Sequence, residues 1–348
     1  MSGNVAEVSV QRRSSKSLEG TKPIAKEGKS VTWKNGGDKK ALRDRILNRL
    51  KTLGQLILSV LLEFLRLNGQ ALYLLGKDVL QLALPPKEKS LRGALVLVTG
   101  SGQNLGRELS LQLAQHGARL VLWDFNEDQN EETAKMIRDG GGEAHAFTCD
   151  VSDQKAVASV AAKVREEIGH PEYVINNAGT YCYKPFLTHS PEEISRLVSV
   201  NLLGNMWVTR EFLGHMVDLG RGHVVSVSSI LGYMGRNYVV PYCASKFGVK
   251  GMTEALAEEI RKSGKGQGIC VTAVHPFLIS NVSDVKPNLK FPSLFEVLTP
   301  TDAARRIIRG IRRNQEELFL PEKLKPLIVM SKVLPRSLRR LFGDYMEY

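Results

Sequence analysis

The sequence predicts an α/β fold built on one doubly wound parallel sheet of about seven strands, preceded by an amphipathic, hydrophobic extension. Three observations support this prediction. From about Leu91 onward, short apolar runs alternate with helical patterns, as expected when helices cover both faces of a parallel sheet. A glycine-rich turn follows the first of these runs. Polar residues end several runs, where such sheets bind their ligands.

The segment 89–322 contains all of the expected sheet. Its strands are the apolar runs at 95–99, 119–123, 144–148, 172–176, 222–228, 269–274 and 316–320. Helical patterns separate these runs, for example at 153–168 and 244–262. Glycines at 140–142 mark the end of another helix. We therefore expect one domain over this segment.

The first 50 residues are expected to form a basic tail that is disordered to about Lys40, because apolar periodicity is lacking and Ser, Gly and Lys are frequent. Residues 1–51 hold 13 Lys and Arg against 5 Asp and Glu, which accounts for +8 of the chain's net charge of +12. Such a tail either binds an anionic lipid surface or is simply solvated. No DNA- or RNA-recognition module is visible, so we expect no nucleic-acid partner.

The segment 51–88 reads as an amphipathic, membrane-associating element. Apolar residues recur at helical spacing at Leu53, Leu56, Ile57, Val60, Leu61 and Phe64. A bilayer span needs about 20 predominantly apolar residues, but Glu63 and Arg66 interrupt this run. A helix in the membrane interface, or a re-entrant hairpin, is therefore favoured over a clean span. The alternative is a helix packed on the domain or on a partner subunit. Pro85 and Pro86 end the segment and precede an expected linker.

The final segment, 323–348, is expected to be a basic amphipathic extension. It mixes Leu, Ile, Val and Phe with Lys332, Arg336, Arg339 and Arg340. A second interfacial patch, a lid over the substrate cleft and a solvated tail all fit this pattern.

The stretch ALVLVTGSGQNLGRELSLQLAQHGARLVLWD predicts a strand, a glycine-rich turn, a helix and a second strand with an acidic end. Gly100, Gly102 and Gly106 bring backbone close to a ligand, and the N-terminus of a helix suits a pyrophosphate. Asp124 lies where a carboxylate accepts hydrogen bonds from adenosine ribose hydroxyls. The pattern predicts a Rossmann-type dinucleotide site for NAD. NADP is possible, because Arg107 could meet a 2′-phosphate, although Asp124 would repel it.

Ser229, Tyr242 and Lys246 form the second informative pattern. Tyr242 and Lys246 lie four residues apart in a helical stretch, so they share one face. A free Tyr has a pKa of about 10, and a neighbouring ammonium lowers it. Reaching about 7 requires roughly 4 kcal/mol of differential stabilisation. We expect Tyr242 to move a proton, Lys246 to tune it and Ser229, at a strand end, to bind the substrate oxygen.

Together these motifs resemble the short-chain dehydrogenase/reductase family over roughly 90–320. The matching residues are TGSGQNLG at 99–106, CDVSD at 149–153, NNAG at 176–179, Asn201 in SVNLLG, Ser229, and YCASK at 242–246. The resemblance implies a catalytic set of Asn201, Ser229, Tyr242 and Lys246, in which Asn201 holds a water that links Lys246 to solvent. It also implies that Lys246 binds the nicotinamide ribose. Two departures stand out: Asn104 replaces a family glycine, and 276–281 lacks the family's Pro-Gly and Thr.

The resemblance extends to a cofactor-binding set. The expected residues are Gly100, Ser101, Gly102, Asn104, Leu105, Gly106, Asp124, Asp150, Val151, Asn177, Ala178, Gly179, Tyr242, Lys246 and Ile279. Within this set, Asp150 is expected near the adenine and Asn177 beside the cofactor.

The expected activity is reversible oxidation of an alcohol to a carbonyl, with hydride passing to or from NAD(H). The chain resembles the family branch that acts on retinoids and hydroxysteroids at membranes or lipid droplets. This implies a lipophilic substrate and an endoplasmic reticulum or lipid-droplet location. We expect the catalytic domain to face the cytosol, because the positive flank stays on that side and the thiols lack partners, and we also expect a homodimer. Substrate contacts are expected from Ser229, Tyr233 and Tyr242, with Tyr181, Tyr183, Leu231, Met234 and Phe277 as further candidates.

Two other activities compete with this one: a carbonyl reductase that uses NADPH on small substrates, and a catalytically weak membrane or lipid-droplet scaffold protein. The intact Asn, Ser, Tyr and Lys argue against the scaffold.

The four cysteines, Cys149, Cys182, Cys243 and Cys270, are scattered without CxxC spacing or histidine clusters. This argues against a zinc site and a disulfide framework, so no metal is expected. It also favours a reducing compartment. The first apolar run starts near residue 53, too far from the N-terminus for a secretory signal.

Overall fold

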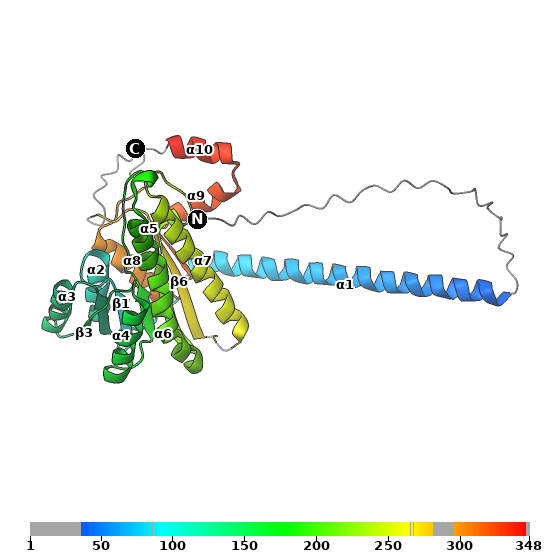
Figure 1. Ribbon diagram of the computed structural model, residues 1–348. Coiled ribbons are helices and arrows are strands. Elements are labelled where there is room, and N and C mark those ends of the chain that lie inside the picture. The colour runs from blue at the N-terminus through cyan, green and yellow to red at the C-terminus, as the bar shows by residue number, and fades with distance from the viewer. Residues whose placement is uncertain (1–35, 85, 265, 267, 281–294, 346–348) are drawn as a thin grey trace, which may run out of the picture. The chain divides into compact units, whose positions relative to one another are not determined.

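The computed structural model describes residues 36–84, 86–264, 266, 268–280 and 295–345 (Figure 1). The chain divides into two compact units, 1–83 and 84–348. Most of the expected disordered tail, residues 1–35, lies outside the described residues.

The second unit contains the predicted sheet, with seven parallel strands in the order β3-β2-β1-β4-β5-β6-β7. The strands are β1 (Leu95–Thr99), β2 (Arg119–Asp124), β3 (Glu143–Thr148), β4 (Tyr173–Asn176), β5 (Arg221–Val227), β6 (Gly268–Pro276) and β7 (Glu317–Leu320). The α/β prediction is confirmed, and every predicted strand falls within three residues of its observed bounds.

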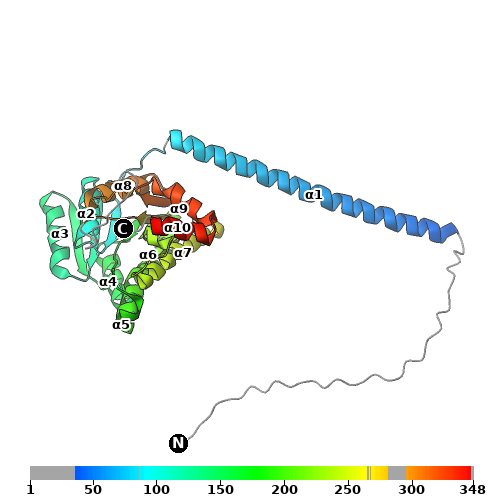
Figure 2. The ribbon, with the colours of Figure 1, turned by 90° about the horizontal axis from the view of Figure 1, so that it is seen from above.

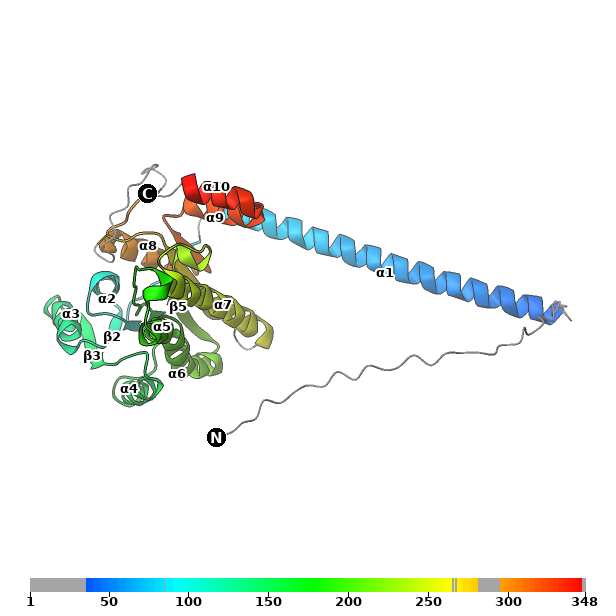
Figure 3. The same cartoon turned by 45° about the horizontal axis from the view of Figure 1, so that its top comes forward.

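Helices cover both faces of this sheet, so the strands carry apolar residues on both sides. On one face lie α2 (Asn104–Gln115), α3 (Glu127–Asp139) and α8 (Pro300–Arg312); on the other lie α4 (Gln154–Glu167), α6 (Gly204–Leu219) and α7 (Val240–Ser263). Figure 3 shows α2, α3 and α8 together, with α4 and α6 across the strands from them. Leu109 and Ile307 pack in the first core, and Val164 and Phe212 in the second.

Short elements complete this unit near the carboxyl ends of the strands. They are η1 (Phe186–Thr188), α5 (Pro191–Val198), the π-helical turn η2 (Ser199–Leu203) and η3 (Ile230–Gly232). The strand order reverses between β1 and β4, because β1 is followed in sequence by β2 on one side but pairs with β4 on the other. Parallel sheets bind ligands at such a switch point, outside the carboxyl ends of the strands.

The first unit is one continuous helix, α1 (Gly36–Ala83), of 48 residues. It begins within the segment expected to be disordered, and the expected boundary between residues 50 and 51 falls inside it, because Leu42, Ile46 and Leu50 continue the apolar period. The helix also runs through Asn68 and Gly69, so the structure does not form the re-entrant hairpin. Among the described residues, no helix combines the length and apolar character needed to cross a membrane.

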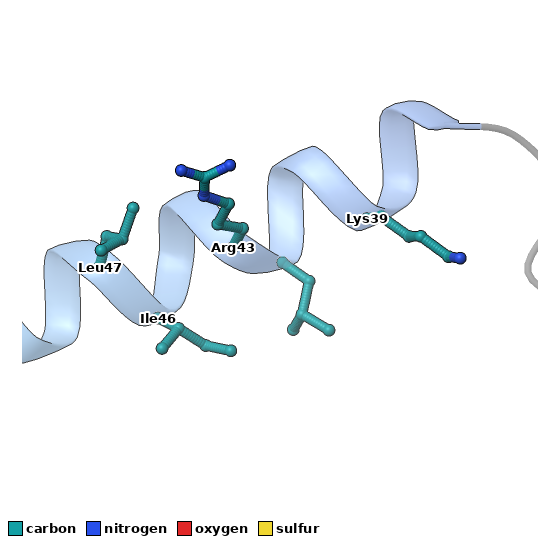
Figure 4. Close-up of a pocket in the computed structure, with 5 residues that line it drawn as sticks. Lys39, Arg43, Ile46 and Leu47 are labelled. Atoms are coloured by element: carbon teal, nitrogen blue, oxygen red, sulfur yellow. The ribbon is translucent and has the colours of Figure 1, made fainter.

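The side chains described along α1 are exposed, including large apolar ones such as Leu56 at 59% and Phe64 at 62%. A shallow hollow at its first turns is lined by residues of this helix alone, and Figure 4 shows Arg43 and Leu47 on one side with Ile46 on the other. This hollow contains none of the expected catalytic residues. The helix therefore presents apolar and basic side chains that its own unit does not cover.

The expected linker before the domain is fixed to it. Glu88 pairs with Arg312 at 2.6 Å and Arg313 at 3.0 Å, and the Lys89 ammonium lies 3.1 Å from His223 Nδ1. These contacts join the end of the linker to α8 and β5.

The C-terminal segment forms α9 (Leu324–Val333) and α10 (Arg336–Tyr345). Leu324 and Ile328 are buried with Ile230, Tyr233 and Phe319, so α9 packs on the domain. This packing argues against a solvated tail for α9. Figures 1 and 2 show α9 and α10 over the end of the domain at which α7 begins.

Candidate active site

The glycine turn joins β1 to α2 and brings backbone atoms close together. Gly100 has φ +67°, and Asn104 takes the left-handed φ of +47° that its glycine-like position required. A Cβ on Gly106 would lie only 1.8 Å from the Gly100 carbonyl oxygen. No side chain caps the start of α2, and its first turn has no acidic residue. The N–H groups of that turn are thus left for an anionic ligand.

Asp124 stands beside this turn at the end of β2. One carboxylate oxygen accepts from Gly102 N at 2.9 Å and the other from Asn126 N at 3.0 Å. The side chain is buried at 6% exposure, so its orientation is set by the backbone around it. Carboxylate oxygens retain further lone pairs after these bonds, which keeps Asp124 available to ribose hydroxyls.

Asn177, at the end of β4, closes the turn from the opposite side. Its side-chain amide donates to the carbonyl oxygens of Thr99 at 3.0 Å and Gly100 at 3.1 Å. Thr99 Oγ1 in turn accepts from the backbone N–H groups of Asn177 and Ala178, both at 3.1 Å. Asn177 thus lies where the cofactor was expected, and its described contacts hold the glycine turn in shape. Thr99, which opens the TGSGQNLG motif, was not singled out from the sequence, yet its hydroxyl fixes the turn after β4.

Asp150 lies after β3 and pairs with Arg196 at 2.6 Å, while its other oxygen accepts from Ser152 N at 2.9 Å. Burial alone would raise the pKa of Asp150, but the hydrogen bonds from Arg196 and Ser152 outweigh it and hold the pKa below its usual range. The carboxylate therefore stays ionised at neutral pH.

Four members of the expected cofactor set have side chains that face the core: Ser101, Leu105, Val151 and Ile279. The Ser101 hydroxyl donates to Asn130 Oδ1 at 2.7 Å, and Ile279 packs with Leu298. Contact between these residues and a cofactor would use their backbone atoms, and their assignment stays a prediction.

Lys246 and Asn201 converge on Gly179. A Cβ on Gly179 would lie 3.6 Å from Lys246 Nζ and 3.3 Å from Asn201 Oδ1. Lys246 Nζ donates to the Val227 carbonyl at 2.9 Å and lies 5.6 Å from the centre of the Tyr242 ring. Lys246, Asn201 and Gly179, expected from separate motifs, are thus brought to one place by α7, η2 and the turn after β4.

Asn201 sits in the π-helical turn η2, a deformation that is frequent at functional sites. Its amide donates to the Thr180 carbonyl at 2.9 Å and to Ser245 Oγ at 3.0 Å, and its oxygen accepts from Thr180 N at 2.7 Å. The side chain is fully buried and fixed by these bonds. Ser245, within the YCASK motif, is a second contact that sequence reasoning did not single out.

Ser229 begins η3 directly after β5, where its Oγ accepts from Leu231 N at 3.1 Å. Its hydroxyl also hydrogen-bonds the Tyr242 side chain. The expected pairing of Ser229 with Tyr242 is therefore present. Tyr181 lies against Tyr242 in an edge-to-face arrangement, with ring centres 5.0 Å apart.

Burial raises the pKa of Tyr242 to about 12, because it outweighs the hydrogen bond from Ser229, which lowers the pKa. The residue as a whole is partly exposed. The expectation that Lys246 would bring this pKa to about 7 is not met. Burial of the phenol is the main cause. Lys246 meanwhile donates to the Val227 carbonyl, and burial lowers the pKa of its ammonium to about 8.

A family model described as short chain dehydrogenase matches residues 94–289, which include the glycine turn and all four residues of the expected catalytic set. The chain belongs to the short-chain dehydrogenase/reductase family. It is therefore an oxidoreductase with the fold and motifs of that family.

Similar proteins in this family include human epidermal retinol dehydrogenase 2, which is 37% identical over 80% of this chain and 90% of its own length. Human 17-beta-hydroxysteroid dehydrogenase 13 is 33% identical over 80% of this chain and 91% of its own length. Among solved structures, a metagenomic short-chain oxidoreductase in complex with NADP is 28% identical, with a TM-score of 0.56, over 66% of this chain and 96% of that chain.

The expected substrate residues divide into two groups in this short-chain dehydrogenase. Tyr181, Tyr183 and Met234 are exposed, at 36%, 50% and 39%. Tyr233 is buried, with its ring against His275 and Phe319 and its hydroxyl on the Glu317 carboxylate. Leu231 and Phe277 pack against the same cluster. The described contacts of Tyr233 join η3 to β7, and its expected contact with the substrate stays a prediction.

The raised pKa of Tyr242 predicts a pH dependence that differs between the two reaction directions. Oxidation needs the phenolate as base, and a raised pKa leaves little phenolate at neutral pH. We expect kcat/KM for alcohol oxidation to rise from pH 7 to 9, by up to about tenfold per unit. Reduction of the carbonyl needs the protonated phenol, so its kcat/KM should not rise over this pH range. Initial rates at constant ionic strength would measure both. A plateau for oxidation already at pH 7 would contradict the raised pKa.

Proposed function

We propose that this enzyme reversibly oxidises a lipophilic alcohol of the retinoid or hydroxysteroid type to its carbonyl, using NAD(H). The observation that carries the proposal is the convergence of Ser229, Tyr242, Lys246 and Asn201 beside the glycine turn, at the carboxyl ends of β1, β4 and β5. This arrangement pairs a proton-transfer group with an oxygen-binding hydroxyl next to a site shaped for a dinucleotide.

The residues at the turn fit a nicotinamide dinucleotide. The uncapped start of α2 offers N–H groups to a pyrophosphate, and a side chain at Gly106 would fill the turn. Asp124 would hold the adenosine ribose, and Lys246 the nicotinamide ribose. When bound, the nicotinamide ring supplies the hydride acceptor or donor. The complex of the metagenomic relative with NADP supports this class of cofactor.

The chain's own residues then handle the proton. Tyr242 removes the hydroxyl proton as the carbinol carbon becomes a carbonyl, and returns it in the reverse direction. Ser229, which already hydrogen-bonds the Tyr242 side chain, donates to the substrate oxygen. Lys246 keeps a positive charge near the ring at neutral pH, because its pKa stays at about 8. Asn201 and the Thr180 backbone exchange two hydrogen bonds, which hold the Asn201 side chain in place near Lys246.

The preference for NAD rests on two charged groups. Asp124 would repel a 2′-phosphate, and Arg107 is engaged by the Gly102 carbonyl at 2.6 Å and by Glu132 at 2.5 Å. Because Arg107 is already paired, it is not free to attract a 2′-phosphate.

Asp124→Ala should therefore weaken NAD binding and narrow the preference for NAD over NADP, since it removes both the ribose acceptor and the repelling charge. Titrations of both cofactors against each protein would measure the ratio of the two affinities. Asp153→Ala is a matched control, because its carboxylate caps α4 instead. Tighter binding of NADP than NAD by the unchanged protein would defeat the assignment.

The lipophilic substrate class is supported by the surroundings of Tyr242 and by the relatives. Exposed aromatic and apolar side chains follow β4 and η3, namely Tyr181, Tyr183, Phe186, Leu187, Met234 and Tyr238. Such a concentration suits an apolar substrate better than a sugar or acid. The two curated relatives described above are named for retinol and a 17-beta-hydroxysteroid.

The decisive experiment is a substrate panel with detergent-solubilised full-length protein, following NADH and NADPH absorbance with retinoids, hydroxysteroids and short-chain carbonyls. Turnover of a retinoid or steroid with NAD(H) supports the proposal. Turnover restricted to small carbonyls with NADPH would favour a carbonyl reductase, and no turnover of any substrate would favour a scaffold role.

We further propose association with the endoplasmic reticulum membrane or a lipid droplet through α1, with the catalytic domain on the cytosolic side. The exposed apolar residues of α1 and the basic residues at its start support this, because interfacial helices combine both features. All four cysteines are free thiols, as suits a reducing compartment. A homodimer, also expected, stays a prediction.

Truncation to begin at Lys87 should release the protein into solution, while the full-length chain should sediment with membranes or float with lipid droplets. This cut removes α1 and preserves the contacts of Glu88 and Lys89 with the domain. Fractionation at physiological salt would measure the distribution. A full-length protein that stays in the high-speed supernatant without detergent would contradict the proposed membrane association.

A further inference from the structure

Ser229 stands at the start of a short element, η3, and the position of η3 decides where the Ser229 hydroxyl lies. Ser229 caps this start by accepting from Leu231 N at 3.1 Å. Tyr233 ends η3 and donates its N–H to the Ile230 carbonyl at 2.9 Å. A 3-10 turn of this length has few hydrogen bonds of its own. The orientation of Ser229 therefore depends on what holds η3 from outside.

On one side, η3 lies directly against α7. Gly232 allows this approach, because a Cβ there would lie 2.8 Å from the Lys246 carbonyl oxygen and 2.8 Å from Ser228 Oγ. Ser228 Oγ donates to the same carbonyl at 2.9 Å. The turn thus rests on the backbone of the helix that carries Tyr242 and Lys246. This contact sets how closely Ser229 approaches Tyr242.

On the other side, Tyr233 ties the end of η3 to three further elements. Its hydroxyl donates to the Glu317 carboxylate of β7, and its backbone carbonyl accepts from Lys332 of α9. The centre of its ring lies 4.9 Å from that of His275 in β6 and 5.3 Å from that of Phe319 in β7. Tyr233 is only 9% exposed, so these contacts are largely shielded from water. Of the four, the hydroxyl contact can be removed without disturbing the packing of the ring.

We propose that Tyr233 and Glu317 are positioning residues, which hold η3 against α7 and so keep the Ser229 hydroxyl aligned with Tyr242. The inference rests on the proposed function and deepens it, because it adds two residues that act on the reaction through Ser229. A misplacement of about 1 Å at a reacting group can cost about a hundredfold in rate. A tie at the far end of the turn that Ser229 begins therefore bears on turnover.

The first test compares Tyr233→Phe, Glu317→Ala and Glu317→Gln in the full-length protein. Tyr233→Phe keeps the ring and removes the donor, whereas Glu317→Ala removes the acceptor. Each should lower kcat about tenfold or more, while the affinity for NAD should change little, because the glycine turn is untouched. Glu317→Gln keeps a carbonyl oxygen that accepts the hydroxyl, so it should retain most of kcat.

Tyr173→Phe is the matched control for loss of a phenol hydroxyl. Tyr173 begins β4, and its ring lies 4.7 Å from the Lys89 ammonium, away from η3. Its kcat should stay unchanged. Impairment of Tyr233→Phe together with full activity of Glu317→Ala would overturn the proposal, because the Tyr233 hydroxyl would then act on another group, such as the substrate.

A double-variant cycle separates positioning from a purely structural role. Ser229→Ala alone removes the hydroxyl that binds the substrate oxygen, a change that typically costs about 10² to 10³-fold in kcat. If Tyr233 acts through Ser229, adding Tyr233→Phe to Ser229→Ala should lower kcat little further. Independent losses would instead multiply, and that result would show that Tyr233 does not act through Ser229.

A readout without turnover keeps this inference distinct from the proposed function. The N–H groups of Leu231, Gly232 and Tyr233 form the hydrogen bonds of η3. Deuterium exchange of peptides that span 230–234 should therefore be at least about fivefold faster in Tyr233→Phe than in the unchanged protein. Peptides from β2 should exchange equally in both, which shows that the domain remains folded. Equal exchange at 230–234 would overturn the inference even if no substrate were found, whereas an unchanged protein without turnover would overturn only the proposed function.

Discussion

Tyr242→Phe is expected to reduce turnover by at least about 10² to 10⁴-fold, the usual contribution of general acid–base catalysis. The substitution keeps the ring, and so keeps the edge-to-face contact with Tyr181 and the position of Lys246. It removes only the hydroxyl that Ser229 contacts and that transfers the proton. Cofactor affinity should change little, because the glycine turn and Asp124 are untouched. Steady-state rates and cofactor titration measure the two quantities separately.

Tyr238→Phe is a matched control for this change. Tyr238 is 43% exposed, and its ring lies 5.3 Å from that of Tyr183, outside the catalytic set. It should retain nearly full activity. A Tyr242→Phe protein that kept more than about a tenth of the wild-type rate would show that Tyr242 is not the proton-transfer group.

Gly106→Ala is expected to have the second-largest effect, on cofactor binding and on stability together. The added methyl would meet the Gly100 carbonyl oxygen at 1.8 Å and the Asn177 amide at 2.7 Å. The carbonyl belongs to the turn itself and the Asn177 amide holds it from β4, so the turn must open to accept the methyl group. Overpacking of this kind typically costs about 1–3 kcal/mol of unfolding free energy. Dinucleotide affinity should fall at least about tenfold, because the N–H groups of α2 move with the turn.

Gly251→Ala is the matched control, and it should raise the stability of the protein where Gly106→Ala lowers it. Gly251 lies within α7, and nothing would lie within 4 Å of its new methyl group. Alanine is favoured over glycine in a helix by about 1 kcal/mol, so this variant should be slightly more stable. Thermal unfolding and cofactor titration check both proteins. Gly106→Ala with unchanged cofactor affinity would contradict the role given to the turn.

The sequence allowed the sheet to be predicted because its strands are buried on both faces. Runs such as Leu95–Thr99 must then be continuously apolar, which distinguishes them from amphipathic helices. The start of α1 was harder to place, because residues 36–50 combine helical periodicity with the charge and polarity of a tail. In the structure these residues are helical, as their apolar periodicity predicts and their polar composition does not.

The proposed catalytic residues could also be named from the sequence, since their spacing within YCASK and their order along the chain are properties of sequence. Their electrostatics were not. The pKa of Tyr242 depends on how completely the folded chain excludes water and on the hydrogen bond with Ser229. Both are set by packing between segments far apart in sequence. The same holds for Tyr233, whose hydroxyl bonds to Glu317, 84 residues later in the chain.

The sequence by itself determined the fold class, the glycine turn and the apolar character of α1, because each depends on local pattern and residue type, and its family motifs supplied the proposed catalytic set. Only the tertiary structure decided which groups Arg107, Asn177 and Asn201 bond, and that α9 packs beside η3, which follows Ser229. Hydrogen bonds and burial join residues that are distant in sequence, so no local pattern encodes them.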